Sequence, residues 1–139
     1  RKVAAKAAFD TQTAIIGTGT TMIDFASHKL DDAPGILVLD LTGSLDTQNS
    51  EYLMDCVQGH IEDGIDRIIL NCAALDFISS MGLGTLIRAM ARLKKQGGTV
   101  ALAGAHGAVA DVLRLVRLNR LLNIYGDVGE AAAALRQES

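Results

Sequence analysis

Short apolar segments alternate with stretches of helical periodicity over most of this chain, and this alternation constrains the fold more than any other feature. The apolar segments are ILVLDL (36–41), RIILN (67–71) and TVALA (99–103). Runs of this length and composition are typical of buried strands. Because a helical stretch connects each segment to the next, we expect these strands to be parallel within an α/β layer.

Two long stretches between these strands predict helices. The first runs to about Asp63 with Asp46 or Thr47 as its cap, and the second begins at Ser80 and ends at Gly97. Their apolar side chains recur at helical spacing: Leu53, Cys56, Val57 and Ile61 in the first, and Leu83, Leu86, Ile87, Met90 and Leu93 in the second. The rest of the chain predicts a helix near 109–116, a short strand at 122–125 and an Ala-rich helix at 128–137.

The N-terminal part predicts an antiparallel pair. TMIDFAS (21–27) suits a strand and KLDDAPG (29–35) has the Asp, Pro and Gly of a turn, so we expect a hairpin with the first apolar segment. Residues 1–20 form an extension of undefined structure, in which the Ala-rich start suits a short helix and GTGTT (17–21) a loop. The expected fold is therefore α/β, with a mixed four- to five-stranded sheet, an N-terminal β-hairpin and about four helices packed on it.

Composition excludes several classes of function. The 139 residues carry a formal net charge of −3, and no basic stripe is dense enough to neutralise several phosphates, so no nucleic-acid partner is expected. The densest basic cluster is expected to be one solvated helix face: Arg88, Arg92, Lys94 and Lys95. No run is long enough to span a bilayer, and a signal peptide is not expected. Cys56 and Cys72 lack metal-ligand spacing and are expected to be reduced, as in a cytoplasmic protein.

The segment DFISSMGLGTLI (76–87) carries the most distinctive chemistry. A hydrolase nucleophile elbow needs glycine two residues before and two residues after its serine, and Ile78 occupies the first of these positions for Ser80. A dinucleotide-binding fingerprint needs a third glycine where Ile87 stands. The three histidines are expected in a turn, a helix and a loop, without a catalytic role: His28, His60 and His106. We therefore expect no enzyme, no cofactor and no metal site.

Ser80 stands at the strand-to-helix junction, where a serine can cap the free N–H groups of the first helical turn. A cap does not explain Gly82 and Gly84, because glycine costs a helix about 0.8–1.0 kcal/mol relative to alanine. Two explanations remain open, namely close packing of the helix on the sheet and close approach of a partner. A phosphate on Ser80 would suit the helix N-terminus and would act by repelling a docked surface.

Three motifs resemble one known family. LDFISSMGLGTLIRAMARLKKQGGTVALAG strongly resembles the STAS domain of bacterial anti-sigma factor antagonists, and LVLDLTGSLDT resembles the second-strand signature of that family. LRLVRLNRLLNIYGDVGEAAAAL resembles its C-terminal end. The similarity covers about Thr21 to Leu135, which implies an STAS domain at 21–139.

The resemblance implies a binding protein with a phosphorylation switch. Unphosphorylated members hold an anti-sigma factor that is itself a serine kinase, and so release a sigma factor. The kinase phosphorylates a serine at the start of the second main helix, and a phosphatase resets the cycle. An alternative is an STAS domain of a transporter, a lipid-transport accessory or a signalling scaffold without the switch. Residues 1–20 lie outside the resemblance and suit either a linker from a larger regulator or transporter or a helix of a variant subfamily.

The resemblance also assigns the site. Ser80 matches the phosphoacceptor of the family pattern Asp-Ser-Ser-Gly, Ser79 replaces the Asp and is the less favoured acceptor, and Met81 replaces the second Ser. Asp46 matches the Asp of Gly-x-Leu-Asp, near the phosphosite and the kinase, and a capping role is compatible with this. The expected partner-binding residues are Ser44, Asp46, Thr47, Ser79, Ser80, Met81, Gly82, Leu83 and Gly84.

Overall fold

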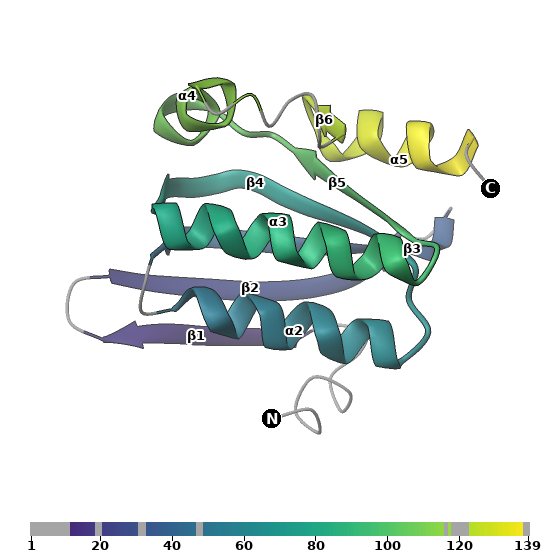
Figure 1. The fold of residues 1–139 in the computed structure, drawn as a ribbon. Helices are drawn as coiled ribbons and strands as arrows, with labels where there is room; N and C mark the ends of the chain where they lie inside the picture. The colour runs from purple at the N-terminus through teal and green to yellow at the C-terminus, as the bar shows by residue number, and fades with distance from the viewer. Residues whose placement is uncertain are drawn as a thin grey trace.

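The computed structural model describes residues 12–18, 21–30, 33–46, 49–115, 117 and 123–137, and within them the chain forms six strands and four helices (Figure 1). The strands are β1 (Gln12–Thr18), β2 (Thr21–Leu30), β3 (Ala33–Leu45), β4 (Arg67–Ile78), β5 (Thr99–Ala103) and β6 (Asn123–Tyr125). The helices are α2 (Ser50–Glu62), α3 (Ser80–Lys95), α4 (Gly107–Leu115) and α5 (Val128–Gln137). The strand–helix alternation expected from the sequence is confirmed.

The six strands make one mixed sheet in chain order, β1-β2-β3-β4-β5-β6. β1, β2 and β3 pair antiparallel, and β3, β4, β5 and β6 pair parallel. The expected N-terminal hairpin is therefore the β2–β3 pair, and the helical crossovers make the inner strands parallel. The sheet has one strand more than the upper expectation, because β1 lies in the extension whose structure the sequence left undefined.

Hydrophobic cores lie on both faces of the sheet. On one face α2, α3 and α4 cover the larger core, which includes Leu39, Leu41, Leu53, Val57, Leu70, Leu86, Leu93, Leu102 and Leu113. On the other face α5 covers a smaller core, which includes Ile36, Val38, Ile69, Ala101, Ala131 and Leu135. Successive residues of β3 thus point into different cores, which explains why its sequence is an uninterrupted apolar run.

Several expected boundaries were wrong. The expected turn at 29–35 is mostly strand, since Lys29 and Leu30 belong to β2 and Ala33–Gly35 to β3. Within the expected loop at 17–21, residues 17 and 18 belong to β1 and residue 21 to β2. Strand pairing reaches Leu30 and Ala33 in the β2–β3 ladder and Thr18 and Thr21 in the β1–β2 ladder, closer to each turn than local turn propensity indicates.

Candidate functional site

The expected site lies where β3 and β4 end side by side. Leu45 pairs with Ile78 in the parallel register, and the backbone N–H of Ser79 donates to the carbonyl oxygen of Leu45 at 2.9 Å. α2 and α3 follow these strands and start at the same edge of the sheet (Figure 1). The carboxyl edge of neighbouring parallel strands is where α/β proteins place binding sites. The structure therefore brings the Ser44–Asp46 segment and the Ser79–Gly84 segment together.

Ser79, and not Ser80, caps α3. The Ser79 backbone is extended (φ −88°, ψ 172°), and its hydroxyl accepts a hydrogen bond from the backbone N–H of Gly82 at 3.0 Å. Ser80 is the first helical residue and is exposed, and its hydroxyl has no hydrogen-bond partner among the described residues. The expectation that Ser80 is the cap is thus wrong by one residue, and the correction leaves the Ser80 hydroxyl accessible.

Replacing Ser79 with alanine is expected to destabilise the fold by about 1 kcal/mol, because one N–H group of the first turn of α3 loses its acceptor. Ser80→Ala is the matched control in the neighbouring residue, and it should change stability by less than about 0.5 kcal/mol. Urea denaturation followed by circular dichroism measures both variants. Equal losses for the two variants would contradict the assignment of the cap.

The β3–α2 loop is held by a reciprocal pair of hydrogen bonds. The Asp46 carboxylate accepts from the backbone N–H of Asn49 at 3.0 Å, and the Asn49 side chain accepts from the N–H of Asp46 at 2.8 Å. The Asn49 amide also donates to the carbonyl oxygen of Ser44 at 2.8 Å. The N-cap position of α2 is Asn49, so Asp46 shapes the loop before the helix and is not its N-cap. Thr47 lies outside the described residues.

The two glycines of α3 occupy different surroundings. A Cβ atom on Gly82 would lie 2.8 Å from the carbonyl oxygen of Leu45 and 3.0 Å from the Leu45 side chain, which is closer than real Cβ contacts. A Cβ atom on Gly84 would meet no atom of the described residues within 4 Å. The packing explanation therefore holds for Gly82, which lets α3 approach the end of β3. It does not hold for Gly84.

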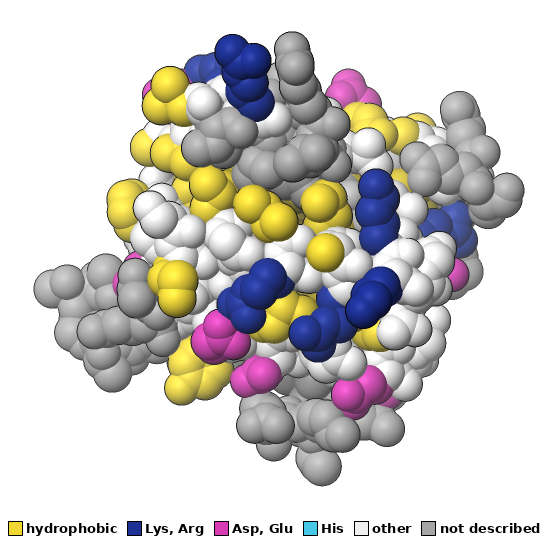
Figure 2. Space-filling model, in the orientation of Figure 1, with side chains coloured by type: hydrophobic (Ala, Val, Ile, Leu, Met, Phe, Trp, Pro, Cys, Tyr) yellow, Lys and Arg dark blue, Asp and Glu magenta, His cyan; other side chains and the backbone are white. Residues whose placement is uncertain are grey.

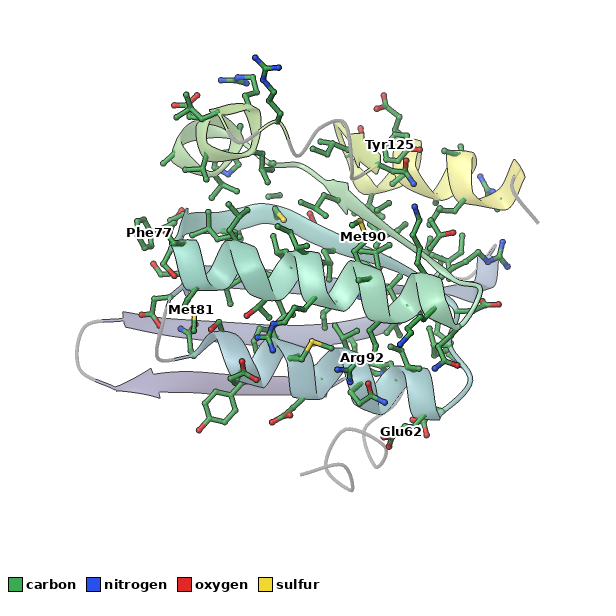
Figure 3. The ribbon with its side chains drawn as sticks, in the orientation of Figure 1. Glu62, Phe77, Met81, Met90, Arg92 and Tyr125 are labelled. Atoms are coloured by element: carbon green, nitrogen blue, oxygen red, sulfur yellow. The ribbon has the colours of Figure 1, made fainter. Side chains whose placement is uncertain are left out.

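Large apolar side chains are exposed around the same edge. Phe77 is 48% exposed, Met81 52% and Tyr52, in the first turn of α2, 49%. Figure 3 shows Phe77 and Met81 at the same end of α3. Exposed apolar side chains gathered at one edge are typical of an interaction surface.

Of these three residues, sequence reasoning found only Met81. Phe77 is outward because the β3–β4 register shifts between Gly43 and Ser44, so that Asp76 and Phe77 are exposed in succession. Strict strand alternation would not place two neighbouring residues outside. Tyr52 could have been found from the sequence, since its position on α2 lies outside the apolar stripe and an aromatic side chain there is expected to be exposed.

Catalytic chemistry at this edge has little support. None of the three histidines hydrogen-bonds to Ser79 or Ser80: His28 lies 3.6 Å from the Asp40 carboxylate, the His106 ring contacts the carbonyl oxygen of Ala73, and His60 is buried in α2. Burial lowers the pKa of His60, partly opposed by Asp63 and reinforced by Lys29. His28 belongs to strand β2, and its expected place in a turn was wrong.

The cysteines are poor nucleophiles in this fold. Both are free, as expected. Burial, with the nearby Asp55 charge, raises the pKa of Cys56 to about 11, and burial raises the pKa of Cys72 to about 12. Both thiols therefore stay protonated at neutral pH. Among the described residues no group of three His, Cys, Asp or Glu side chains could hold a metal ion. No helix in the described part of the chain is long and apolar enough to cross a membrane.

Comparison with known protein families identifies the fold. The model of the STAS domain matches residues 28–131, which is about three quarters of the chain. The chain belongs to the STAS domain family. The expected resemblance is therefore confirmed, and so is the expected α/β fold. The matched segment includes the β3–β4 edge and all of α3, so the serines lie inside it, whereas β1 lies outside.

Relatives within the STAS domain family carry names from one kind of regulation. The putative anti-sigma factor antagonist BtrV of Bordetella bronchiseptica is 25% identical over 77% of this chain and 92% of its own length. The anti-sigma F factor antagonist of Paenibacillus polymyxa is 27% identical over the same shares. The crystal structure of a putative anti-sigma factor antagonist from Thermotoga maritima is 25% identical, with a TM-score of 0.70 over 81% of this chain and 94% of that one.

Two more distant structures share the fold alone. One is the Bacillus cell fate determinant SpoIIAA in its phosphorylated form, at 19% identity and a TM-score of 0.58 over 88% of this chain and 98% of that one. The other is a sulfate transporter family protein from Wolinella succinogenes, at 17% identity and a TM-score of 0.66 over 74% of this chain and 86% of that one. The STAS fold thus occurs in both regulators and transporters.

Proposed function

We propose that this chain is an anti-sigma factor antagonist, which binds an anti-sigma factor serine kinase while Ser80 is unmodified and is released when Ser80 is phosphorylated. Binding of the kinase frees a sigma factor, and a phosphatase resets the switch. The partner-binding residues are Ser44, Asp46, Thr47, Ser79, Ser80, Met81, Gly82, Leu83 and Gly84. The action on transcription places this function in the cytoplasm.

The observation that carries the proposal is the separation of cap and acceptor at adjacent serines. The Ser79 hydroxyl is occupied by the Gly82 N–H, whereas the Ser80 hydroxyl is exposed and has no partner among the described residues. A kinase needs an accessible hydroxyl, so Ser80 is the acceptor that the geometry favours. The anti-sigma factor antagonist names of the relatives support the proposed class of function.

A phosphate on Ser80 would also be compatible with the start of α3. A phosphate adds about −1.5 to −2 charges, and the first turn of α3 contains no acidic residue that would repel it. The positive end of the helix dipole favours the negative charge. The Asp46 carboxylate lies on the neighbouring loop, so the modified edge would combine two acidic groups. A partner that docks there would meet a changed charge on an otherwise unchanged fold.

Incubation with ATP and each purified anti-sigma factor kinase of the source organism tests the proposal. We expect one kinase to add a single phosphate to the chain, which intact-mass measurement detects and fragmentation maps to Ser80. Ser80→Ala should abolish the increment and Ser79→Ala should retain it. Normal phosphorylation of Ser80→Ala would refute the acceptor assignment, and no phosphorylation by any kinase would refute the switch.

The alternative function is an STAS domain without a switch, in a transporter or a scaffold. The shared fold of the Wolinella succinogenes transporter protein favours keeping it. Such a domain has no need of an accessible hydroxyl next to its helix cap. Absence of phosphate on protein isolated from its native cells, both with and without stress, would support this alternative.

A further inference from the structure

Gly84 has no structural reason to be glycine within the described part of the chain. It lies inside α3, its backbone is helical, and an added Cβ atom would meet no described atom within 4 Å. Alanine there would favour the helix. Gly82, two residues earlier, is different because a Cβ atom would collide with Leu45. A glycine that weakens a helix without serving its packing indicates that something outside the fold uses the bare backbone.

Gly84 is at the centre of the outward face of α3. Side chains three, four, seven and eleven residues away share a helix face, which here comprises Ser80, Met81, Ile87, Arg88, Ala91 and Lys95. All six are exposed. Met81 and Ile87 are among the exposed large hydrophobic residues, 52% and 36%, and they lie three residues before and three residues after Gly84. We call the space left by the missing side chain of Gly84 the notch. It lies between these two apolar side chains, one turn from Ser80.

The C-terminal half of α3 is basic, and Arg88 and Lys95 bring part of that charge to the same face. α3 contains four basic residues and no acidic one, in a chain whose net charge is −3. Arg88 is paired with Glu51 of α2, and the Arg92 guanidinium donates to Gln58. Lys95 is exposed three turns beyond Gly84 on the same face. Figure 2 shows the Lys and Arg side chains gathered where α3 runs in Figure 1.

We propose that the anti-sigma factor kinase lies along α3, with an apolar side chain seated on the bare backbone at Gly84 and a carboxylate facing Lys95. This inference rests on the function proposed above and extends the contact surface about four turns beyond Ser80, to the end of α3. Close approach to a glycine backbone between two apolar side chains favours an apolar group. Charge complementarity favours an acidic surface opposite the basic half of the helix.

Gly84→Gln tests the notch, because glutamine favours the helix but fills the space above the backbone. We expect at least a tenfold loss of affinity for the purified kinase that phosphorylates Ser80, measured by calorimetry without ATP. The melting temperature should stay equal to or rise above that of the parent. Ala133→Gln is the matched control, since Ala133 is an exposed helical residue on α5, on the opposite face of the sheet. It should bind like the parent.

Lys95→Glu tests the direction in which the kinase extends. We expect association to slow at least threefold at low salt, with a smaller effect at high salt. Binding of Gly84→Gln within twofold of the parent, or unchanged association of Lys95→Glu, overturns the inference while phosphorylation of Ser80 still stands. If no kinase binds the parent chain, the proposed function fails and this inference fails with it.

Discussion

Ser80→Asp is expected to weaken binding of the anti-sigma factor kinase about 30- to 100-fold, which corresponds to about 2–3 kcal/mol. The carboxylate would stand at the exposed first residue of α3, beside the loop that carries Asp46. A partner that fits the neutral serine would have to desolvate a charge there or meet it with one of its own. Surface plasmon resonance with immobilised kinase gives the affinity directly.

Two neighbouring variants make this experiment specific. Ser80→Ala should keep the affinity within about threefold, because it removes no hydrogen bond within the described fold. Ser79→Asp adds the same charge one residue earlier, where an aspartate can serve as the N-cap, and it should also keep most of the affinity. If Ser79→Asp and Ser80→Asp weaken binding equally, the affinity for the kinase depends on net charge at this edge and not on the position of Ser80.

Gly82→Val is expected to destabilise the fold by about 2–4 kcal/mol. Its Cβ atom would fall 2.8 Å from the carbonyl oxygen of Leu45, which accepts the Ser79 N–H. Because that contact is with backbone, relief requires α3 to move away from the end of β3. Movement of this kind would weaken the hydrogen bond that joins the two site segments.

Gly84→Val is the matched control for this second prediction, because it places the same side chain in the same helix where a Cβ atom has open space. It should leave stability within about 0.5 kcal/mol of the parent, since valine is no worse than glycine in a helix. Urea denaturation of both variants measures the difference. A similar loss for both would show that the loss at residue 82 comes from a valine side chain anywhere in this turn of α3, and not from the approach of α3 to β3.

The inner strands of the fold could be predicted because both faces of each are buried. β3 and β4 read as apolar runs for that reason, and the connecting helices follow from periodicity. β1 was not predicted, since an edge strand in which only Ile15 and Ile16 are large and apolar is held by hydrogen bonds to its neighbour and has a weak signal of its own. The extension of β3 to Leu45 passes through Gly43, whose φ of +108° allows a register shift that no residue pattern announces.

The cap of α3 was predicted to within one residue, and the error has a clear cause. Either Ser79 or Ser80 is a good cap by residue type. What decides between them is tertiary: the Ser79 N–H is bound to Leu45 of the neighbouring strand, so its backbone stays extended and the helix begins one residue later. The different surroundings of Gly82 and Gly84 likewise depend on where Leu45 lies, which is information from 37 residues earlier in the chain.

Because one serine caps α3 and its neighbour is the proposed acceptor, phosphorylation is easier to detect by some methods than by others. Because the hydroxyl that starts α3 belongs to Ser79, a phosphate on Ser80 leaves the helix initiation intact and adds only a modest favourable interaction with its dipole. Thermal-shift screening would therefore register little difference between the two forms. Native electrophoresis and ion-exchange chromatography respond to charge and would separate the two forms. A search for the modifying enzyme should therefore measure electrophoretic or chromatographic mobility rather than melting temperature.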